Sequence, residues 1–298
     1  MVKPQRPPSR QQPAPPAATH PTISARWLLS AFALTLCAAA LCGYAALCLL
    51  FYQGQWQFLF HPSRTIAATP ATAGLAFDDI RFDVNDTGLP RLDGWWIPAV
   101  SGAPYSSSTI LYLHDARGSL SDTVPALAAL HNLGINIFAI DYQGFGRSAG
   151  AHPTERLATQ DSAAAFAWLT DTRHISPGTI IVYGDGVGAV FAAHLAALFA
   201  PAGVILQDPN PPAGQIFLQD PRARMLPLVL LQKEKLDPKA DLARAHIPRL
   251  FIDRQGDSAR TRQLFLASSD RKEYFDLRAA SESTVDATLR RFLDEVLR

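Results

Sequence analysis

The stretch TIIVYGDGVGAVFAAHLAALF, Thr179 to Phe199, decides the fold of this chain. Its first five residues, Thr179 to Tyr183, are rich in β-branched side chains, which is typical of a buried strand. A glycine cluster follows at Gly184, Gly186 and Gly188, and an alanine-rich run continues without any spacer. We therefore expect a strand, a sharp turn and a helix in direct succession.

Strand and helix patterns alternate on both sides of this stretch. Two alternating runs, Phe77 to Val84 and Arg91 to Ile97, flank a turn-forming segment and predict an antiparallel hairpin. Further strands are expected at residues 109–113, 135–140, 203–207, 249–253 and 273–277, and further helices at 123–132, 155–170, 261–268 and 285–297. Because strands that alternate with helices form parallel sheets covered on both faces, we expect an α/β fold with a mostly parallel sheet.

The alternation breaks between Asp208 and Asp241, where six prolines surround the apolar cluster Met225 to Leu231. A cap or lid inserted over the carboxyl ends of the strands accounts for this break. We therefore expect one globular domain at residues 75–298, with its cap at about 208–241.

Composition limits the classes of function. A net charge of +1 gives no electrostatic basis for binding nucleic acid, and 48% hydrophobic residues among 298 allow one large core. Residues 1–26 contain four basic residues, seven prolines and no acid. Such a segment cannot bury enough apolar surface to fold, so we expect a disordered tail.

Residues 27–51 contain no charged side chain and, at ~1.5 Å per residue, predict a helix that spans a bilayer. A cleaved signal peptide is the alternative, although its apolar region is expected to have only about 7 to 15 residues. Four basic residues precede the segment and only Arg64 follows closely, so the positive-inside rule predicts a single-pass cell-membrane protein with a cytoplasmic N-terminus. The globular domain would then lie on the far, periplasmic or extracytoplasmic, side.

Residues 52–74 are expected to form a juxtamembrane connector. Its aromatic residues are of the kind found in interfacial belts: Tyr52, Trp56, Phe58 and Phe60.

All three cysteines, Cys37, Cys42 and Cys48, lie within the apolar segment. The globular part therefore has neither a disulfide nor a thiol nucleophile. Its histidines show no i, i+4 pairing and no neighbouring cysteine, so we expect no metal site.

Two further motifs follow predicted strands: DYQGFGRS, Asp141 to Ser148, and the single residue His114. DYQGFGRS resembles the D-Y-x-G-x-G-x-S signature of many α/β-hydrolases, and His114 resembles the His-Gly start of their oxyanion loop. The glycine cluster is similar to the frame of their nucleophile elbow, G-x-S-x-G. Together these motifs resemble the α/β-hydrolase superfamily over residues 77–297, closest to its membrane-anchored, serine-aminopeptidase-like and acyl-hydrolase-like branch. The resemblance implies an α/β-hydrolase fold.

The catalytic positions that the resemblance implies are altered. That family uses a serine nucleophile, an acid and a histidine, in this chain order. Gly184 and Gly188 bracket the nucleophile position at Gly186, which has no side chain to form an acyl-enzyme. The acid position falls on Asp257, and Asp208 is a second place where some members keep the acid.

The base is also missing from its expected place. The final histidine of the chain, His246, precedes the strand at 249–253 instead of following the last strand. In the loop at 279–284, where the family has its histidine, only Glu282 could accept a proton.

The resemblance places His114, Asp115 and Val187 around the oxyanion pocket. Asp115 stands where glycine is usual, and a carboxylate there would oppose a developing oxyanion. We expect Gly186→Ser to lower stability slightly without creating activity, because no histidine is available to deprotonate the hydroxyl.

The same stretch fits two other patterns. Asp185 as a carboxylate nucleophile is disfavoured, because bulky residues flank it where small ones are needed. The glycine pattern also fits a dinucleotide fingerprint, G-x-G-x-x-A, at Gly184, Gly186 and Ala189, with Asp208 about 20 residues further on. Such a site usually opens its domain at the first strand, whereas several elements precede it here.

We therefore expect a membrane-anchored pseudoenzyme whose hydrolase-like domain binds an acyl or other small-molecule ligand, or a protein partner, without a cofactor. The alternative is an active esterase, acyl hydrolase or peptidase with an unrecognised nucleophile. Ser119, Ser121 and Ser148 are the candidates for that role because they stand near predicted strand ends.

Overall fold

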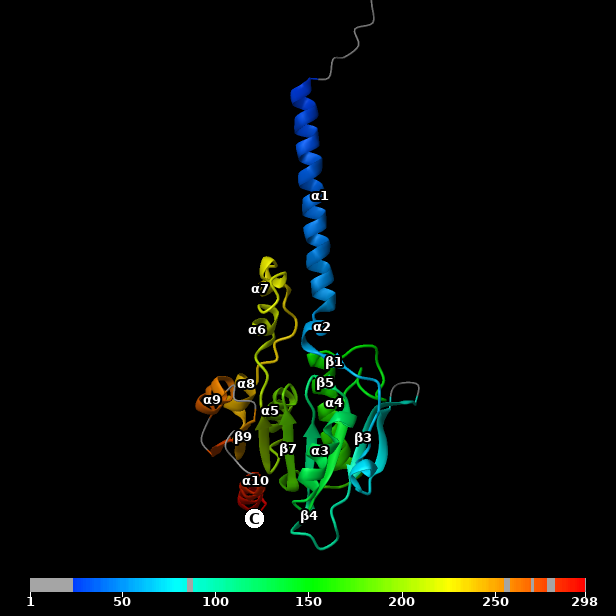
Figure 1. Cartoon of the computed structure of the whole chain (residues 1–298), viewed down its shortest axis with the longest axis vertical. Coiled ribbons are helices and arrows are strands. Elements are labelled where there is room, and N and C mark those ends of the chain that lie inside the picture. The colour runs from blue at the N-terminus through cyan, green and yellow to red at the C-terminus, as the bar shows by residue number, and fades with distance from the viewer. Residues whose placement is uncertain (1–23, 85–87, 255–257, 269–270, 278–281, 298) are drawn as a thin grey trace, which may run out of the picture. The chain divides into compact units, whose positions relative to one another are not determined.

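A computed structural model of the chain describes residues 24–84, 88–254, 258–268, 271–277 and 282–297 (Figure 1). The chain forms two compact units, Met1–Leu49 and Leu50–Arg298. Helix α1, Ala25–Gly54, has 30 residues and is long and apolar enough to be a candidate membrane span. It begins two residues before the predicted segment 27–51 and ends three residues after it. Its last turn, from Leu50 onward, belongs to the second unit.

One sheet of eight strands forms the centre of the second unit within the described residues (Figure 1). Its order is β10-β9-β8-β7-β4-β6-β3-β2. The strands are β2 Asp78–Val84, β3 Pro90–Ile97, β4 Tyr105–Leu113, β6 Ile135–Asp141, β7 Ile180–Asp185, β8 Gly203–Gln207, β9 Arg249–Asp253 and β10 Lys272–Asp276. The six strands from β4 to β10 run parallel to their neighbours, whereas the β2–β3 hairpin is antiparallel. The predicted mostly parallel sheet is thus confirmed.

Helices cover both faces of this sheet. They are α3 Leu120–His131, α4 Glu155–Ala167, α5 Gly188–Phe199, α9 Ser258–Ala267 and α10 Glu282–Val296. Ile110 and Tyr112 of β4 join a core cluster to which α3 contributes Leu127 and α10 contributes Phe292. Leu111 lies between them on the strand, points to the opposite face and is also fully buried. Both faces are therefore packed.

The segment between α1 and the sheet is structured. Helix α2, Trp56–Leu59, is followed by β1, His61–Pro62, which pairs in parallel with β5, Arg117–Gly118. Phe60, which the sequence assigned to an interfacial belt, is 1% exposed and packs edge-on against Phe145. It is therefore part of the domain core.

The segment predicted as a cap at 208–241 contains short helices: α6, Ala213–Phe217, and α7, Leu228–Leu231. Helix α8, Lys239–Arg244, packs against α5 in the body of the domain, where His194 lies 3.3 Å from Asp241. Helix α8 therefore packs with the body of the domain. We use "cap" below for residues 209–237.

The strand–turn–helix at Thr179 to Phe199 depends on its glycines. Gly186 has a φ of +57°, a conformation that costs a residue with a Cβ free energy. A Cβ on Gly184 would lie 2.4 Å from the carbonyl oxygen of Gly188, and one on Gly188 would lie 2.0 Å from that of Leu113. The glycines thus allow β4, β7 and α5 to approach more closely than any side chain would permit.

We predict that Gly188→Ala destabilises the domain by about 3 kcal/mol or more, because the new methyl group meets backbone that cannot rotate away. Gly178→Ala is the matched control, since its Cβ would meet only the Ser176 hydroxyl at 3.8 Å. Denaturant unfolding of the full chain in mild detergent measures both variants. Equal stability of the two would contradict the close approach of α5 to β4.

Candidate functional site

A cavity of about 150 Å³ lies at the carboxyl ends of the central parallel strands. Asp185 is the last residue of β7, Asp208 follows β8 directly, and Asp253 is the last residue of β9. Because these strands are neighbours and run parallel, their ends meet at one edge of the sheet. The lining comprises Asp115, Asp185, Gly186, Asp208, Pro209, Asn210, Pro211, Asp253, Arg260 and Thr261.

The carboxylate of Asp115 lies directly over Gly186. An ideal Cβ built on Gly186 would be 2.0 Å from Asp115 Oδ1 and 2.3 Å from its Cγ. The same Oδ1 accepts hydrogen bonds from the backbone N–H of Val187 at 2.9 Å and from Asn210 Nδ2 at 3.0 Å. Asp115 therefore occupies the space into which any side chain at position 186 would project.

This geometry changes the expectation for Gly186→Ser. The sequence predicts only a slight loss of stability, on the grounds of backbone strain. The structure adds a steric term, because the new side chain must displace Asp115 from both of its hydrogen-bond donors. We therefore expect Gly186→Ser to lower the free energy of unfolding by more than backbone strain alone would.

His114 is not among the residues that line the cavity. It is 1% exposed, and its ring packs against Tyr142 and Phe145 at centroid distances of 4.6 and 4.9 Å. Nδ1 donates to the carbonyl oxygen of Asp115 at 2.6 Å, and Nε2 lies 3.4 Å from Asp141 Oδ1. No histidine is among the residues that line the cavity in the described structure.

Asp185 belongs to a buried polar network beside the cavity. Its Oδ1 accepts from Gln207 Nε2 at 2.9 Å, and the hydroxyl of Tyr183 donates to Gln207 Oε1 at 2.6 Å. Burial raises the pKa of Asp185, and the hydrogen bond from Gln207 opposes this shift. The network holds the end of β7 to β8.

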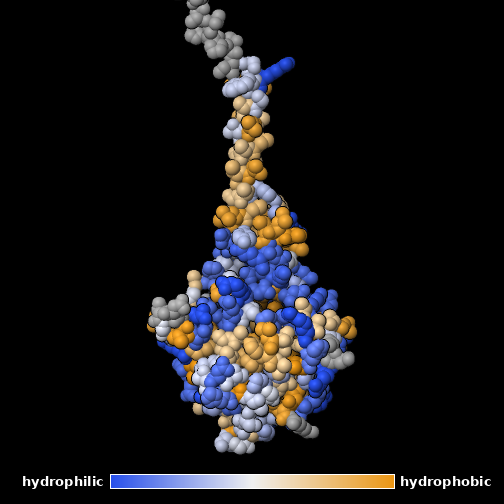
Figure 2. All heavy atoms as spheres, turned by 180° about the vertical axis from the view of Figure 1, so that it is seen from behind, coloured by the Kyte–Doolittle hydropathy of each residue, from blue (hydrophilic) through white to orange (hydrophobic). Residues whose placement is uncertain are grey.

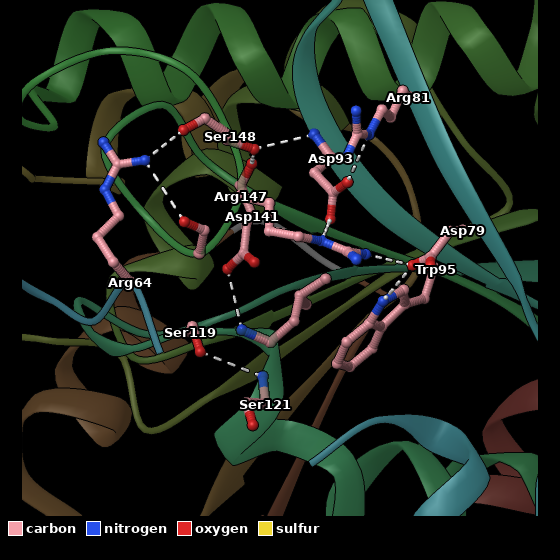
Figure 3. Close-up of polar contacts among 12 residues, drawn as sticks. Arg64, Asp79, Arg81, Asp93, Trp95, Ser119, Ser121, Asp141, Arg147 and Ser148 are labelled. Atoms are coloured by element: carbon pink, nitrogen blue, oxygen red, sulfur yellow. Dashed lines mark hydrogen bonds and ion pairs between the residues drawn. The ribbon is translucent and has the colours of Figure 1, made fainter. Parts of the chain in front are cut away.

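The serines weighed as alternative nucleophiles hold loops together (Figure 3). Ser119 caps α3: its hydroxyl oxygen accepts from the Ser121 N–H, while Asp122 accepts from the Ser119 N–H at 2.9 Å. The Ser121 hydroxyl donates to the carbonyl oxygen of Ala68 at 3.0 Å. Neither serine lines the cavity at Gly186.

Ser148 is the third of these serines, and it closes the DYQGFGRS loop (Figure 3). Its hydroxyl donates to the carbonyl oxygen of Asp141 at 2.6 Å and accepts from the Asp93 N–H at 2.9 Å. Gly146 has a φ of +44°, and a Cβ there would lie 1.9 Å from Asp141 Oδ2. Packing within the loop thus explains why Asp141, Gly146 and Ser148 occur in this motif.

The positions expected to hold the acid and the base are only partly described. Asp257 lies outside the described residues, as do residues 279–281 of the loop after the last strand. Glu282 is the first residue of α10. Asp208, the second position considered for the acid, accepts from the Arg254 N–H at 2.7 Å. Asp253, which lines the cavity, accepts from the Tyr274 hydroxyl at 3.1 Å.

Sequence reasoning missed six residues that line the cavity: Pro209, Asn210, Pro211, Asp253, Arg260 and Thr261. Asn210 comes from the first residues of the cap and is 95 positions away from Asp115, to which it donates. Arg260 comes from α9, and its guanidinium lies 3.1 Å from Asp237. No local pattern could have identified them, since only the fold brings these segments together. Among the described residues, no cluster of His, Cys, Asp and Glu could hold a metal ion.

Comparison with known proteins assigns the fold. An esterase of Pyrococcus furiosus superposes with a TM-score of 0.62 at 17% identity, over 80% of this chain and 98% of that chain. An uncharacterized protein of Mycobacterium tuberculosis is 27% identical over 233 residues, 76% of this chain and 79% of that protein. The protein bem46 of Schizosaccharomyces pombe is 30% identical over 136 residues, 45% of this chain and 44% of that protein. No protein-family model matches the chain.

The chain therefore has the α/β-hydrolase fold, as the motifs predicted. In α/β-hydrolases the turn between the corresponding strand and helix is the nucleophile elbow. In this chain the turn after β7 holds Gly186, and the carboxylate of Asp115 occupies the space above it.

A double-mutant cycle tests the contact between these two residues. We predict that Asp115→Ala alone costs about 1–3 kcal/mol of unfolding free energy through its lost hydrogen bonds. Gly186→Ala alone is expected to cost more than the ~1–2 kcal/mol of backbone strain, because it also displaces the carboxylate. The double variant should be less destabilised than the sum by about 1–2 kcal/mol. Additivity within about 0.5 kcal/mol would show that the two positions do not touch.

Proposed function

We propose that this chain is a membrane-anchored binding protein in which the α/β-hydrolase site holds a small molecule or a partner without hydrolysing it. The observation that carries the proposal is the position of Asp115. Its carboxylate stands where the nucleophile's side chain would be, and it accepts the Val187 N–H. In a nucleophile elbow this N–H, of the residue after the nucleophile, stabilises the oxyanion.

A negative charge at that N–H opposes hydrolysis in two ways. It uses the donor that a tetrahedral intermediate would need, and it repels the charge that develops on the substrate oxygen. Covalent catalysis would also need a nucleophile and a base. Gly186 supplies no nucleophile, and His114 is enclosed by aromatic rings outside the cavity.

The charge of the cavity suggests what it binds. Its lining includes four aspartates, Asp115, Asp185, Asp208 and Asp253, against one arginine, Arg260. Such a lining favours a neutral or positively charged small ligand, and it disfavours a free fatty acid or the pyrophosphate of a dinucleotide. The cavity volume of about 150 Å³ also limits the ligand, or the inserted part of a larger partner, to a small group.

The proposal includes an uncleaved membrane anchor. Helix α1 is long and apolar enough to span a bilayer. The basic residues before it and the near absence of basic residues after it support a cytoplasmic N-terminus, with the domain on the other side of the membrane.

An active hydrolase with an unrecognised nucleophile is the competing function, and a fluorophosphonate probe separates the two. We predict no labelling of the full chain in mild detergent, under conditions in which an active serine hydrolase is labelled fully. The double variant Gly186→Ser/Asp115→Gly should also stay unlabelled, because it restores a hydroxyl and removes the carboxylate but supplies no base.

Labelling of the wild-type chain at one serine would overturn the non-catalytic proposal. Labelling at position 186 in the double variant alone would reveal a base near the elbow and contradict the argument from the missing histidine. Thermal-shift screening with small amines and neutral amides then tests the ligand class, with dinucleotides and fatty acids as the arms expected to give no shift.

A further inference from the structure

We infer that the tip of the cap is a second membrane-contact site, which inserts into the lipid interface of the same bilayer that holds α1. The inference rests on the membrane anchor of the proposed function. It concerns the cap tip, defined here as residues 218–235, which contains α7 and lies away from the Gly186 cavity.

The cap tip exposes large apolar side chains. Val229 is 96% exposed and Leu230 is 82% exposed, and Leu218 and Met225 are exposed beside them. Figure 2 shows apolar surface gathered at the cap end of the domain, bordered by a hydrophilic band. Nearly complete exposure of adjacent apolar residues disfavours a purely structural role, and a contiguous patch of this kind marks an interaction site.

The cap tip is fixed to the residues at which the apolar helix ends. Gln55 follows α1 directly; its Nε2 donates to the carbonyl oxygen of Leu231 at 2.7 Å, and its Oε1 accepts from the Lys233 N–H at 2.9 Å. Gln55 is itself 2% exposed, so both bonds are shielded from water. Phe51, in the last turn of α1, packs edge-on against Phe217 at 5.2 Å.

The contacts of Gln55 and Phe51 with the cap segment favour a bilayer, and not another protein, as the partner of the cap tip. Leu50, in the same compact unit, is also exposed, and it continues an uncharged run that begins at residue 27. The uncharged run continues into the last turn of α1, and the contacts of Gln55 and Phe51 hold the cap tip beside that turn. The apolar side chains of α7 therefore lie at the depth of the lipid interface.

The charges of the cap tip suit lipid headgroups. The segment carries four basic residues, Arg222, Arg224, Lys233 and Lys235, all exposed. Of its two acids, Asp220 is paired with Arg222, and Glu234 is buried and accepts from the Glu155 N–H. Lys233 Nζ lies 3.5 Å from the centroid of the Tyr52 ring. Basic residues around an apolar tip, with a tyrosine beside them, are typical of segments that lie in the interface of anionic membranes.

The test places an environment-sensitive fluorophore, NBD, at the cap tip of the full chain in lipid vesicles. Val229→Cys is made in a Cys37→Ala/Cys42→Ala/Cys48→Ala background, and Leu266→Cys in the same background is the matched control. Leu266 is 69% exposed but lies on α9. Neither substitution disturbs the core, because both side chains are exposed.

In vesicles of phosphatidylcholine with phosphatidylglycerol, we expect the label at position 229 to emit at shorter wavelength and to be quenched by lipids with a shallow doxyl group. Its quenching by aqueous iodide should be about threefold weaker than at position 266. Flotation with the vesicles after alkaline carbonate extraction reports the anchor separately.

Three other outcomes would contradict the inference. A floating chain whose label at 229 behaves like that at 266 overturns the inference and leaves the anchor intact. Shielding from iodide without quenching by doxyl lipid means that a protein, such as a second copy of the chain, covers the cap tip, which also overturns it. Extraction of the chain from the vesicles by carbonate would contradict both the membrane anchor and this inference.

Discussion

The carboxylate of Asp115 over Gly186 is the contact on which the account of this site depends. It satisfies the Val187 N–H at the start of α5 and the side chain of Asn210 from the cap. Gly186 is compatible with it for two reasons that reinforce each other: glycine adopts the positive φ of the turn without strain, and it leaves room for the carboxylate. A serine at this position would conflict with Asp115.

The scaffold around this contact is that of the hydrolases to which the chain is similar. The close approach of α5 to β4 and β7 still requires Gly184 and Gly188, although the turn that they permit presents no nucleophile. The DYQGFGRS loop still closes through Asp141, Gly146 and Ser148. These glycines and this loop are therefore explained by the packing of the fold, and the function has to be argued from the site.

Most of the fold could be predicted from the sequence, because its signals are local. The strands at 203–207 and 249–253 and the glycine-framed turn follow from short apolar runs and from glycine spacing. Gly186 and Asp115 could also be identified as unusual residues from the sequence, since each occupies a fixed place in a motif. That Asp115 lies against Gly186 could not be predicted, because 71 residues separate them and only the pairing of β4 with β7 brings them together. The burial of Phe60 was mispredicted for the same reason, because a run of aromatic residues does not reveal their tertiary partners.

The cap and the end of α1 form one unit through Gln55, so the part of the domain that carries exposed apolar residues is tied to the end of the candidate span. The cavity receives only Pro209, Asn210 and Pro211 from the cap. The cap thus has two ends with different surroundings, an acidic one at the cavity and an apolar, basic one at its tip.

The most direct test of the central claim is an experimental structure of the full chain at a resolution that defines the Asp115 side chain. The account predicts a carboxylate oxygen of Asp115 within hydrogen-bond distance of the Val187 N–H, filling the space over Gly186. A carboxylate turned away, with that N–H facing an open cavity beside a histidine and a serine or other nucleophile, would contradict it.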